Sequence, residues 1–216
     1  MAEVYTSAVQ RLLELPEVFT GSDLTIKFQW TSGTASTYLA KWRRANLVRS
    51  LGGRSDVHMN LVRNREVSAE VALRRAYPRA IKVGVDVLRQ AGWTTQIPSA
   101  VDVAIPRSSV PHAVDGFVLS RRPERWYALV MPGVDKVTSG LDQLKPAWAF
   151  VDMVARARDG RVAGAWLIDP EDLDMDSVFS DNEMKKALLH WGFGTMNPAA
   201  YEALFETWSA TKKMNS

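Results

Sequence analysis

A short segment near the N-terminus concentrates hydroxyl and cationic side chains that could bind an anion. Nine residues between positions 32 and 54 are of interest: Ser32, Thr34, Ser36, Thr37, Lys41, Arg43, Arg44, Arg49 and Arg54. Small hydroxyls at the start of a helix bind phosphates or base edges with help from the helix dipole. Lysine and arginine neutralise the phosphates of a nucleic-acid backbone. These nine residues are therefore candidate DNA contacts, provided that the fold presents them on one surface.

The hydrophobic pattern around these residues predicts three helices followed by a β-hairpin. The expected helices cover residues 2–15, 22–30 and 34–45, and the expected strands cover 47–51 and 57–61. Gly52 and Gly53 lie between the two strands and supply the positive φ that a tight turn needs. This order of elements predicts a winged helix-turn-helix DNA-binding domain over residues 1–66.

In a domain of this kind the third helix lies in the major groove and the wing touches the backbone. Arg54 would then lie at the tip of the wing. A charged helical surface that binds protein is the alternative. The DNA interpretation is favoured because Asn46 ends the third helix directly before the apolar pair Leu47-Val48 and the hairpin. Trp42 is expected in the core of the domain rather than on DNA.

The remainder of the chain, residues 67–216, predicts a mixed α+β domain, so the fold class of the whole chain is α+β. Helical residues are expected over 67–91 with an interruption at Pro78, over 146–158, over 181–191 and over 198–210. Strands are expected from alternating apolar residues between Ile97 and Ile105, over 116–119 and over 126–130.

Composition and charge limit the chemistry that is available. The chain has 216 residues, no cysteine and three histidines. Residues 1–89 hold 14 Lys+Arg against 8 Asp+Glu, or +6, whereas residues 90–216 hold 13 against 16, or −3. A basic first part joined to an acidic remainder is typical of a nucleic-acid-binding module attached to another domain. No secretion signal or membrane-spanning stretch is visible, so we expect a cytoplasmic protein without a membrane partner.

An enzymatic alternative rests on acidic residues in the second domain. One candidate is the run Asp169, Glu171, Asp172, Asp174 and Asp176, and another is Asp102 in a strand followed by Asp115, as in a nuclease-like domain that uses a divalent metal. No phosphate-binding Gly-Lys-Ser/Thr loop and no Gly-x-Ser-x-Gly motif is present. Consecutive acids beside a proline are usually a solvated loop. We therefore predict no catalytic residue, no metal and no cofactor, and we place His58 in the wing and His112 in a loop.

Three stretches, together with the N-terminal domain, carry a family resemblance. They are Val85–Pro98, which passes from a helix through Gly92-Trp93-Thr94 to Gln96-Ile97-Pro98, then Trp148–Asp152, and then Asp169–Asp174. In this order the chain resembles the AbiEi-type antitoxins of abortive-infection, type IV toxin–antitoxin systems. Ala149-Phe150-Val151-Asp152 departs from the Ala-Leu-Ala-Asp that is common in that family.

The resemblance implies a transcriptional repressor that is also an antitoxin. The N-terminal domain would repress its own operon by binding inverted repeats in double-stranded DNA. The C-terminal domain would oppose a nucleotidyltransferase-type toxin. This toxin would be a functional partner that forms no stable complex with the protein.

Overall fold

A computed structural model of the chain describes residues 7–52, 54–158, 168 and 172–193. These residues form two compact units with a mixed α+β architecture. Unit 1 contains the chain up to Ala80 together with the loops His112–Asp115 and Thr138–Leu141, and unit 2 contains the remainder. No helix among the described residues has the length and apolar character needed to cross a bilayer.

Unit 1 is built from four helices and a small antiparallel sheet. In chain order its elements are α1 (Ala8–Leu13), β1 (Val18–Thr20), α2 (Gly21–Phe28), α3 (Ser32–Arg44), β2 (Val48–Ser50), β3 (Val57–Asn60) and α4 (Ala69–Ala76). The strand order is β1-β3-β2, and both pairs are antiparallel. The expected helices and the β2–β3 hairpin are confirmed within the described residues, whereas β1 is an additional strand.

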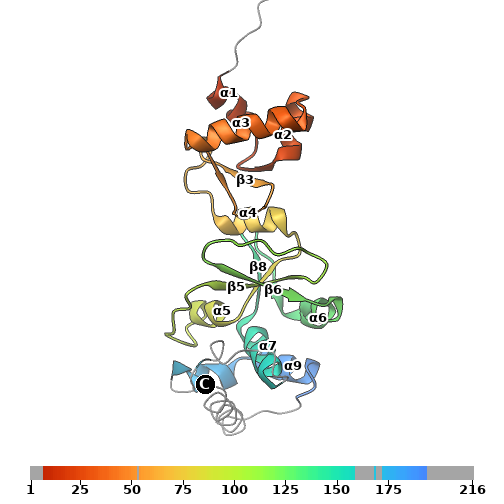
Figure 1. The fold of residues 1–216 in the computed structure, drawn as a ribbon. Helices are drawn as coiled ribbons and strands as arrows, with labels where there is room; N and C mark the ends of the chain where they lie inside the picture. Colours follow the sequence, from red (N-terminus) through yellow and green to blue (C-terminus); the bar gives the residue numbers. More distant parts are fainter. Residues whose placement is uncertain (1–6, 53, 159–167, 169–171, 194–216) are drawn as a thin grey trace, which may run out of the picture. The chain divides into compact units, whose positions relative to one another are not determined.

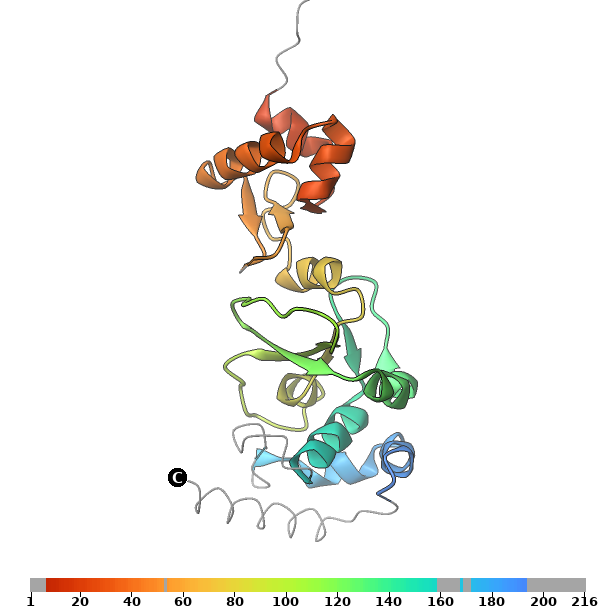
Figure 2. The same ribbon diagram turned by 45° about the vertical axis from the view of Figure 1, so that its right-hand side comes forward.

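The sheet of unit 1 separates α1, α2 and α3 from α4 (Figures 1 and 2). Its first face carries Phe19 and Val48, which pack with Leu12, Leu24 and Leu39 in one buried cluster. Side chains alternate along a strand, so Val57 and Met59 lie on the second face, where α4 packs against β1 and β3. The sheet is thus buried on both sides.

Local sequence signals explain where the helices of unit 1 begin and end. Ser7 and Thr20 each form a capping box, in which the side chain three residues later also bonds back to the cap. Gln29 and Asn46 end α2 and α3 in the left-handed region, each at φ 53°. At the hairpin, Gly52 has φ +126°, and a Cβ at this position would meet the carbonyl of Ala113.

The first unit extends beyond the predicted domain boundary at residues 66 and 67, because it includes helix α4. Glu70 accepts the amide N–H of Leu141 at 3.3 Å, Arg74 donates to the carbonyl of Gly140 at 3.2 Å, and Tyr77 accepts the N–H of His112 at 3.1 Å. These bonds hold the two later loops on α4. Unit 1 therefore continues to Ala80 because α4 packs on its sheet.

Unit 2 contains a five-stranded mixed sheet and five α-helices among its described residues. Its elements are β4 (Ile81–Val83), α5 (Val85–Gln90), β5 (Val101–Pro106), β6 (Phe117–Arg122), α6 (Glu124–Val130), the 3₁₀ turn η1 (Met131–Gly133), β7 (Val134–Asp135), β8 (Asp142–Leu144), α7 (Pro146–Arg158), α8 (Met175–Ser180) and α9 (Met184–His190). The strand order is β6-β5-β4-β8-β7, with β5–β6 and β4–β8 parallel.

One core unites the helices of unit 2. It contains Leu88 of α5, Val130 of α6, Phe150 of α7 and Leu188 of α9. Trp148 of α7 is 2% exposed and lies so close to Gly133 that a Cβ on this glycine would overlap the indole ring.

Unit 2 departs from the sequence predictions at several elements. Residues 81–83 form strand β4 inside the region predicted to be helical, and residues 126–130 form part of helix α6 instead of a strand. Ile97 lies outside β5 and is 81% exposed. Helix α8 was not predicted as a separate element. The predicted helix over 198–210 lies outside the described residues, as do the first residues of the predicted helix over 2–15.

Candidate nucleic-acid interface

Helix α3 exposes one polar and basic face. Its buried side consists of Ala35, Leu39 and Trp42, which confirms Trp42 as a core residue. Six of the predicted residues are exposed on the helix: Ser32, Ser36, Thr37, Lys41, Arg43 and Arg44. The helix contains no acidic residue. Hydroxyls therefore lie at the N-terminal half of this face and cations at the C-terminal half.

The two threonines of this helix already have hydrogen-bond partners. Thr34 is half-buried, and its Oγ1 lies 2.9 Å from Oγ1 of the cap residue Thr31. Thr37 donates from Oγ1 to the carbonyl of Gly33 at 3.0 Å. The hydroxyls of Ser32 and Ser36 line a hollow instead.

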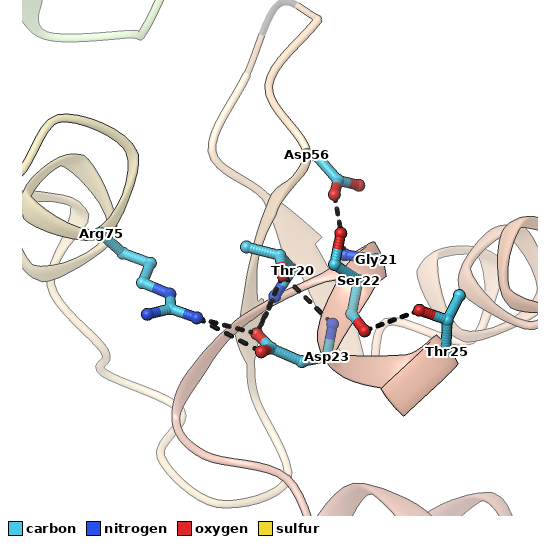
Figure 3. A network of polar contacts seen from close by, with 7 residues as sticks. All are labelled: Thr20, Gly21, Ser22, Asp23, Thr25, Asp56 and Arg75. Carbon is cyan, nitrogen blue, oxygen red and sulfur yellow. Dashed lines mark hydrogen bonds and ion pairs between the residues drawn. The ribbon is translucent and has the colours of Figure 1, made fainter. Parts of the chain in front are cut away.

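This hollow, which we call the N-terminal hollow, lies between α2, α3 and the β2–β3 loop. It has a volume of about 190 Å³, and its polar lining comes from Ser22, Thr25, Ser32, Ser36 and Asp56. Asp56 reaches from the hairpin loop to the start of α2, where its carboxylate accepts the N–H of Gly21 at 3.0 Å (Figure 3). The arrangement brings the hairpin loop beside the first turns of both helices.

The start of α2 is fixed from the other side by Asp23. Its carboxylate accepts hydrogen bonds from the N–H of Thr20 at 2.7 Å and from Arg75 of α4 at 3.3 Å (Figure 3). Burial raises the pKa of Asp23, but the bonds from Thr20 and the charge of Arg75 outweigh this effect and hold its pKa below the ordinary value. The carboxylate therefore stays ionised and links α2 to α4.

Aromatic rings support the basic half of α3 from beneath. Tyr38 stacks on Trp30 with 4.4 Å between ring centroids, and the ammonium of Lys41 lies 5.6 Å from the centroid of the Tyr38 ring. The guanidinium of Arg11 lies 5.0 Å from the same ring. Cations placed over aromatic faces are held in position while remaining charged.

The structure separates Arg49 from the other candidates. On β2, Val48 faces the core beneath α3, so Arg49 faces the opposite side of the sheet. Its Nη2 lies 3.7 Å from Sδ of Met59 and donates to the carbonyl of Val67 at 3.5 Å. Arg54 is exposed in the hairpin loop, as predicted for a wing tip. The sequence could not place Arg49, because a shift of one residue in a strand reverses the face.

His58 is the titratable group of this region that is deeply buried. It lies on β3, is 5% exposed, and has its Nε2 3.8 Å from a carboxylate oxygen of Asp56. Burial lowers the pKa of His58; the charge of Asp56 opposes this shift and that of Arg43 adds to it. The imidazole is therefore neutral at pH 7 and forms part of the core of the hairpin. His112 lies in the β5–β6 loop, as predicted.

The acidic residues considered for an enzymatic site form no cation site among the described residues. Asp102 is buried, accepts the hydroxyl of Ser120 at 2.8 Å and lies 3.6 Å from Arg156. Asp115 belongs to unit 1, whereas Asp102 belongs to unit 2. Asp174 caps α8 by accepting from Ser177. Asp169 and Glu171 lie outside the described residues.

Comparison with known proteins adds a likeness of fold. No protein-family profile matches the chain, and no curated protein matches it. Among solved structures, it is similar to the RV2827C protein from Mycobacterium tuberculosis, with a TM-score of 0.52 over 92% of this chain and 79% of that chain. The two chains share an α+β fold. At 17% sequence identity, the likeness extends to the fold alone.

Proposed function

We propose that the chain is a double-stranded DNA-binding transcriptional regulator, in which α1–α3 and the β2–β3 hairpin act as a winged helix-turn-helix. The observation that carries this proposal is the exposed face of α3, which combines Ser32, Ser36 and Thr37 with Lys41, Arg43 and Arg44 and contains no acid. A helix of 13 residues is about 20 Å long. It fits the major groove, which admits one α-helix.

The N-terminal hollow and the hairpin loop supply the second part of the proposed interface. With α3 in the groove, Ser22 and Thr25 of α2 would be close to one phosphate backbone, and Arg54 would reach the backbone beside the wing. Arg49 is excluded because its side chain lies on the α4 side of the sheet.

We further propose that unit 2 carries the antitoxin role, in which the protein opposes a nucleotidyltransferase-type toxin without a stable complex. The support is the resemblance of residues 85–98, 148–152 and 169–174 to the AbiEi-type antitoxins. The nuclease-like alternative has less support, because Asp102 is buried and paired with Ser120 and Arg156, and Asp115 belongs to the other unit.

The test is a gel-shift and footprinting titration of the full chain on the DNA upstream of its own reading frame, across a series of salt concentrations. The proposal expects a protected inverted repeat and an affinity that falls steeply as salt rises. An adjacent reading frame for a nucleotidyltransferase would support the antitoxin role. If no DNA is bound even at low salt by folded protein, the proposal is wrong.

A matched pair of variants locates the interface. Arg44→Ala combined with Arg54→Ala removes two exposed cations of the proposed surface, and binding should weaken by a factor of about ten or more. Arg49→Ala removes a cation of the same unit from the other face of the sheet and should leave binding within about twofold. Equal losses in both proteins would show that the face was assigned wrongly. Circular dichroism checks that each variant is folded.

A further inference from the structure

A cavity in unit 2 is lined by four arginines and two tryptophans. They are Arg121 and Arg122 at the end of β6, Arg125 and Trp126 in α6, Arg156 in α7, and Trp191 after α9. The volume is about 460 Å³. This is within the range of about 300–1,000 Å³ that is typical of small-molecule sites. We call it the arginine cavity.

Buried hydrogen-bond donors without acceptors gather at this cavity. Within the described part of the chain, the buried nitrogens that lack a hydrogen-bond partner include Nε and Nη2 of Arg122, Nε of Arg156 and Nε1 of Trp191. Arg122 is only 8% exposed. Buried donors in native proteins are normally paired. All four of these atoms are donors, and arginine and tryptophan side chains have no acceptor, so the missing partner must supply several acceptor atoms.

The carboxylates near these arginines do not fill that role. Asp152 accepts from Nε1 of Trp126 at 2.7 Å and lies 3.6 Å from Nη2 of Arg122, while Asp102 lies 3.6 Å from Nη1 of Arg156. Neither aspartate lines the arginine cavity. Four guanidinium groups against two carboxylates leave a net charge of +2. Arg121 and Arg125 are exposed and carry this excess positive charge.

The aromatic lining adds a second requirement for the ligand. Trp126 already has the guanidinium of Arg122 5.4 Å from its ring centroid and donates its N–H to Asp152. Trp191 is half-buried and has a ring that no described cation or aromatic side chain covers. A flat ring of the ligand can stack on this indole, as bases do on aromatic side chains.

We propose that the arginine cavity binds a nucleotide, with its phosphates on Arg121, Arg122, Arg125 and Arg156 and its base against Trp191. Phosphate oxygens supply the acceptors that the buried donors lack, and arginine pairs with phosphate through two parallel hydrogen bonds. The volume accommodates a single nucleotide. This site lies in unit 2 and does not depend on DNA binding by unit 1.

Isothermal titration calorimetry of the full chain tests the site with defined probes. ATP, GTP, CTP and UTP are titrated, and adenosine and inorganic tripolyphosphate separate the contributions of base and phosphate. All measurements use a chain that carries Arg44→Ala and Arg54→Ala, which suppresses binding of nucleic acid by unit 1. At least one nucleoside triphosphate should bind, and adenosine should bind at least about tenfold more weakly.

Three variants assign the binding to the cavity. Arg121→Gln combined with Arg125→Gln removes two exposed cations and should weaken triphosphate binding by about tenfold or more. Trp191→Leu removes both the stacking ring and one donor, so it should weaken binding of the nucleotide more than binding of tripolyphosphate. Arg107→Gln, an exposed arginine of unit 2 outside the cavity, should have no effect.

Two results would overturn the proposal. The first is that none of the triphosphates binds at millimolar concentration, or that binding is unchanged by Arg121→Gln with Arg125→Gln. The second is that a short single-stranded oligonucleotide binds more tightly than every nucleotide and is lost in the same variants, which would assign the cavity to a nucleic-acid strand. Circular dichroism of each variant shows that a lost signal is not lost folding.

Discussion

Asp56 places a negative charge inside a surface that we assign to DNA. Its carboxylate accepts from Gly21 and lies in the N-terminal hollow beside Ser32 and Ser36. Asp56→Asn removes the charge and keeps an oxygen that can accept the same N–H. DNA affinity should therefore rise by about twofold to fivefold, the value of one partly exposed charge. Gel shifts at a fixed salt concentration measure the affinity of the variant for DNA. An unchanged affinity in folded protein would show that the DNA phosphates do not lie near Asp56.

His58 makes the stability of unit 1 depend on pH. Because its pKa in the folded chain is lowered below the unfolded value of about 6.5, the unfolded chain takes up the proton first as pH falls. The stability that neutral His58 contributes to the folded state is fully present above the unfolded pKa. It is lost as pH falls from there toward the folded pKa. When the pH is lowered from neutral to mildly acidic, the melting temperature should therefore fall less in His58→Gln than in the natural sequence. His112→Gln is the control, and an identical loss in His58→Gln would contradict the prediction.

At the scale of elements, Asn60 joins the end of α1 to β3. The side chain is fully buried, donates from Nδ2 to the carbonyl of Leu12 at 2.7 Å, and accepts the N–H of Val62 at 3.3 Å. Asn60→Ala leaves a buried carbonyl and an N–H without these partners. The free energy of unfolding should fall by about 1–3 kcal/mol. Urea denaturation measures this change. Asn64→Ala, at a half-buried position whose side-chain hydrogen bonds are exposed to solvent, should have a smaller effect, and equal changes in the two variants would contradict this account of Asn60.

Elements with a long amphipathic period could be predicted from the sequence, whereas two short buried elements of unit 2 could not. Helix α7 matches the predicted 146–158 because its apolar residues recur over thirteen positions. Residues 126–130 are aromatic and aliphatic, which suits a strand, yet Trp126, Tyr127 and Val130 are the buried face of a helix that follows Pro123. Ile81–Val83 is too short for its period to show.

The candidate surface was predictable along one helix only. The cations of α3 follow from helical spacing, whereas the face occupied by Arg49 depends on strand register. The arginine cavity could not be predicted from the sequence, because Arg122 and Arg156 are distant in the chain and converge only through the packing of β6, α6 and α7.

At the scale of the whole molecule, α4 belongs to the DNA-binding unit. A fragment of residues 1–66 lacks α4 and would expose Val57 and Met59 of the sheet, which are 4% and 3% exposed in the full chain. Residues 1–80 keep α4, with Ala72 and Leu73 completely buried. The longer fragment should therefore melt at a higher temperature and bind less of a hydrophobic dye. Equal melting temperatures would show that α4 does not stabilise the sheet.

The ribosome makes segments of the two units in alternation, so unit 1 is not complete when its first 80 residues have been made. The backbone passes between them five times, after residues 80, 111, 115, 137 and 141, because the loops His112–Asp115 and Thr138–Leu141 belong to unit 1. The helices and sheet of unit 1 are therefore made early, but the loop groups that bond to Glu70, Arg74 and Tyr77 are made later. A nascent chain stalled before residue 138 holds an incomplete first unit, and cutting the gene at residue 80 separates that unit from two pieces of itself.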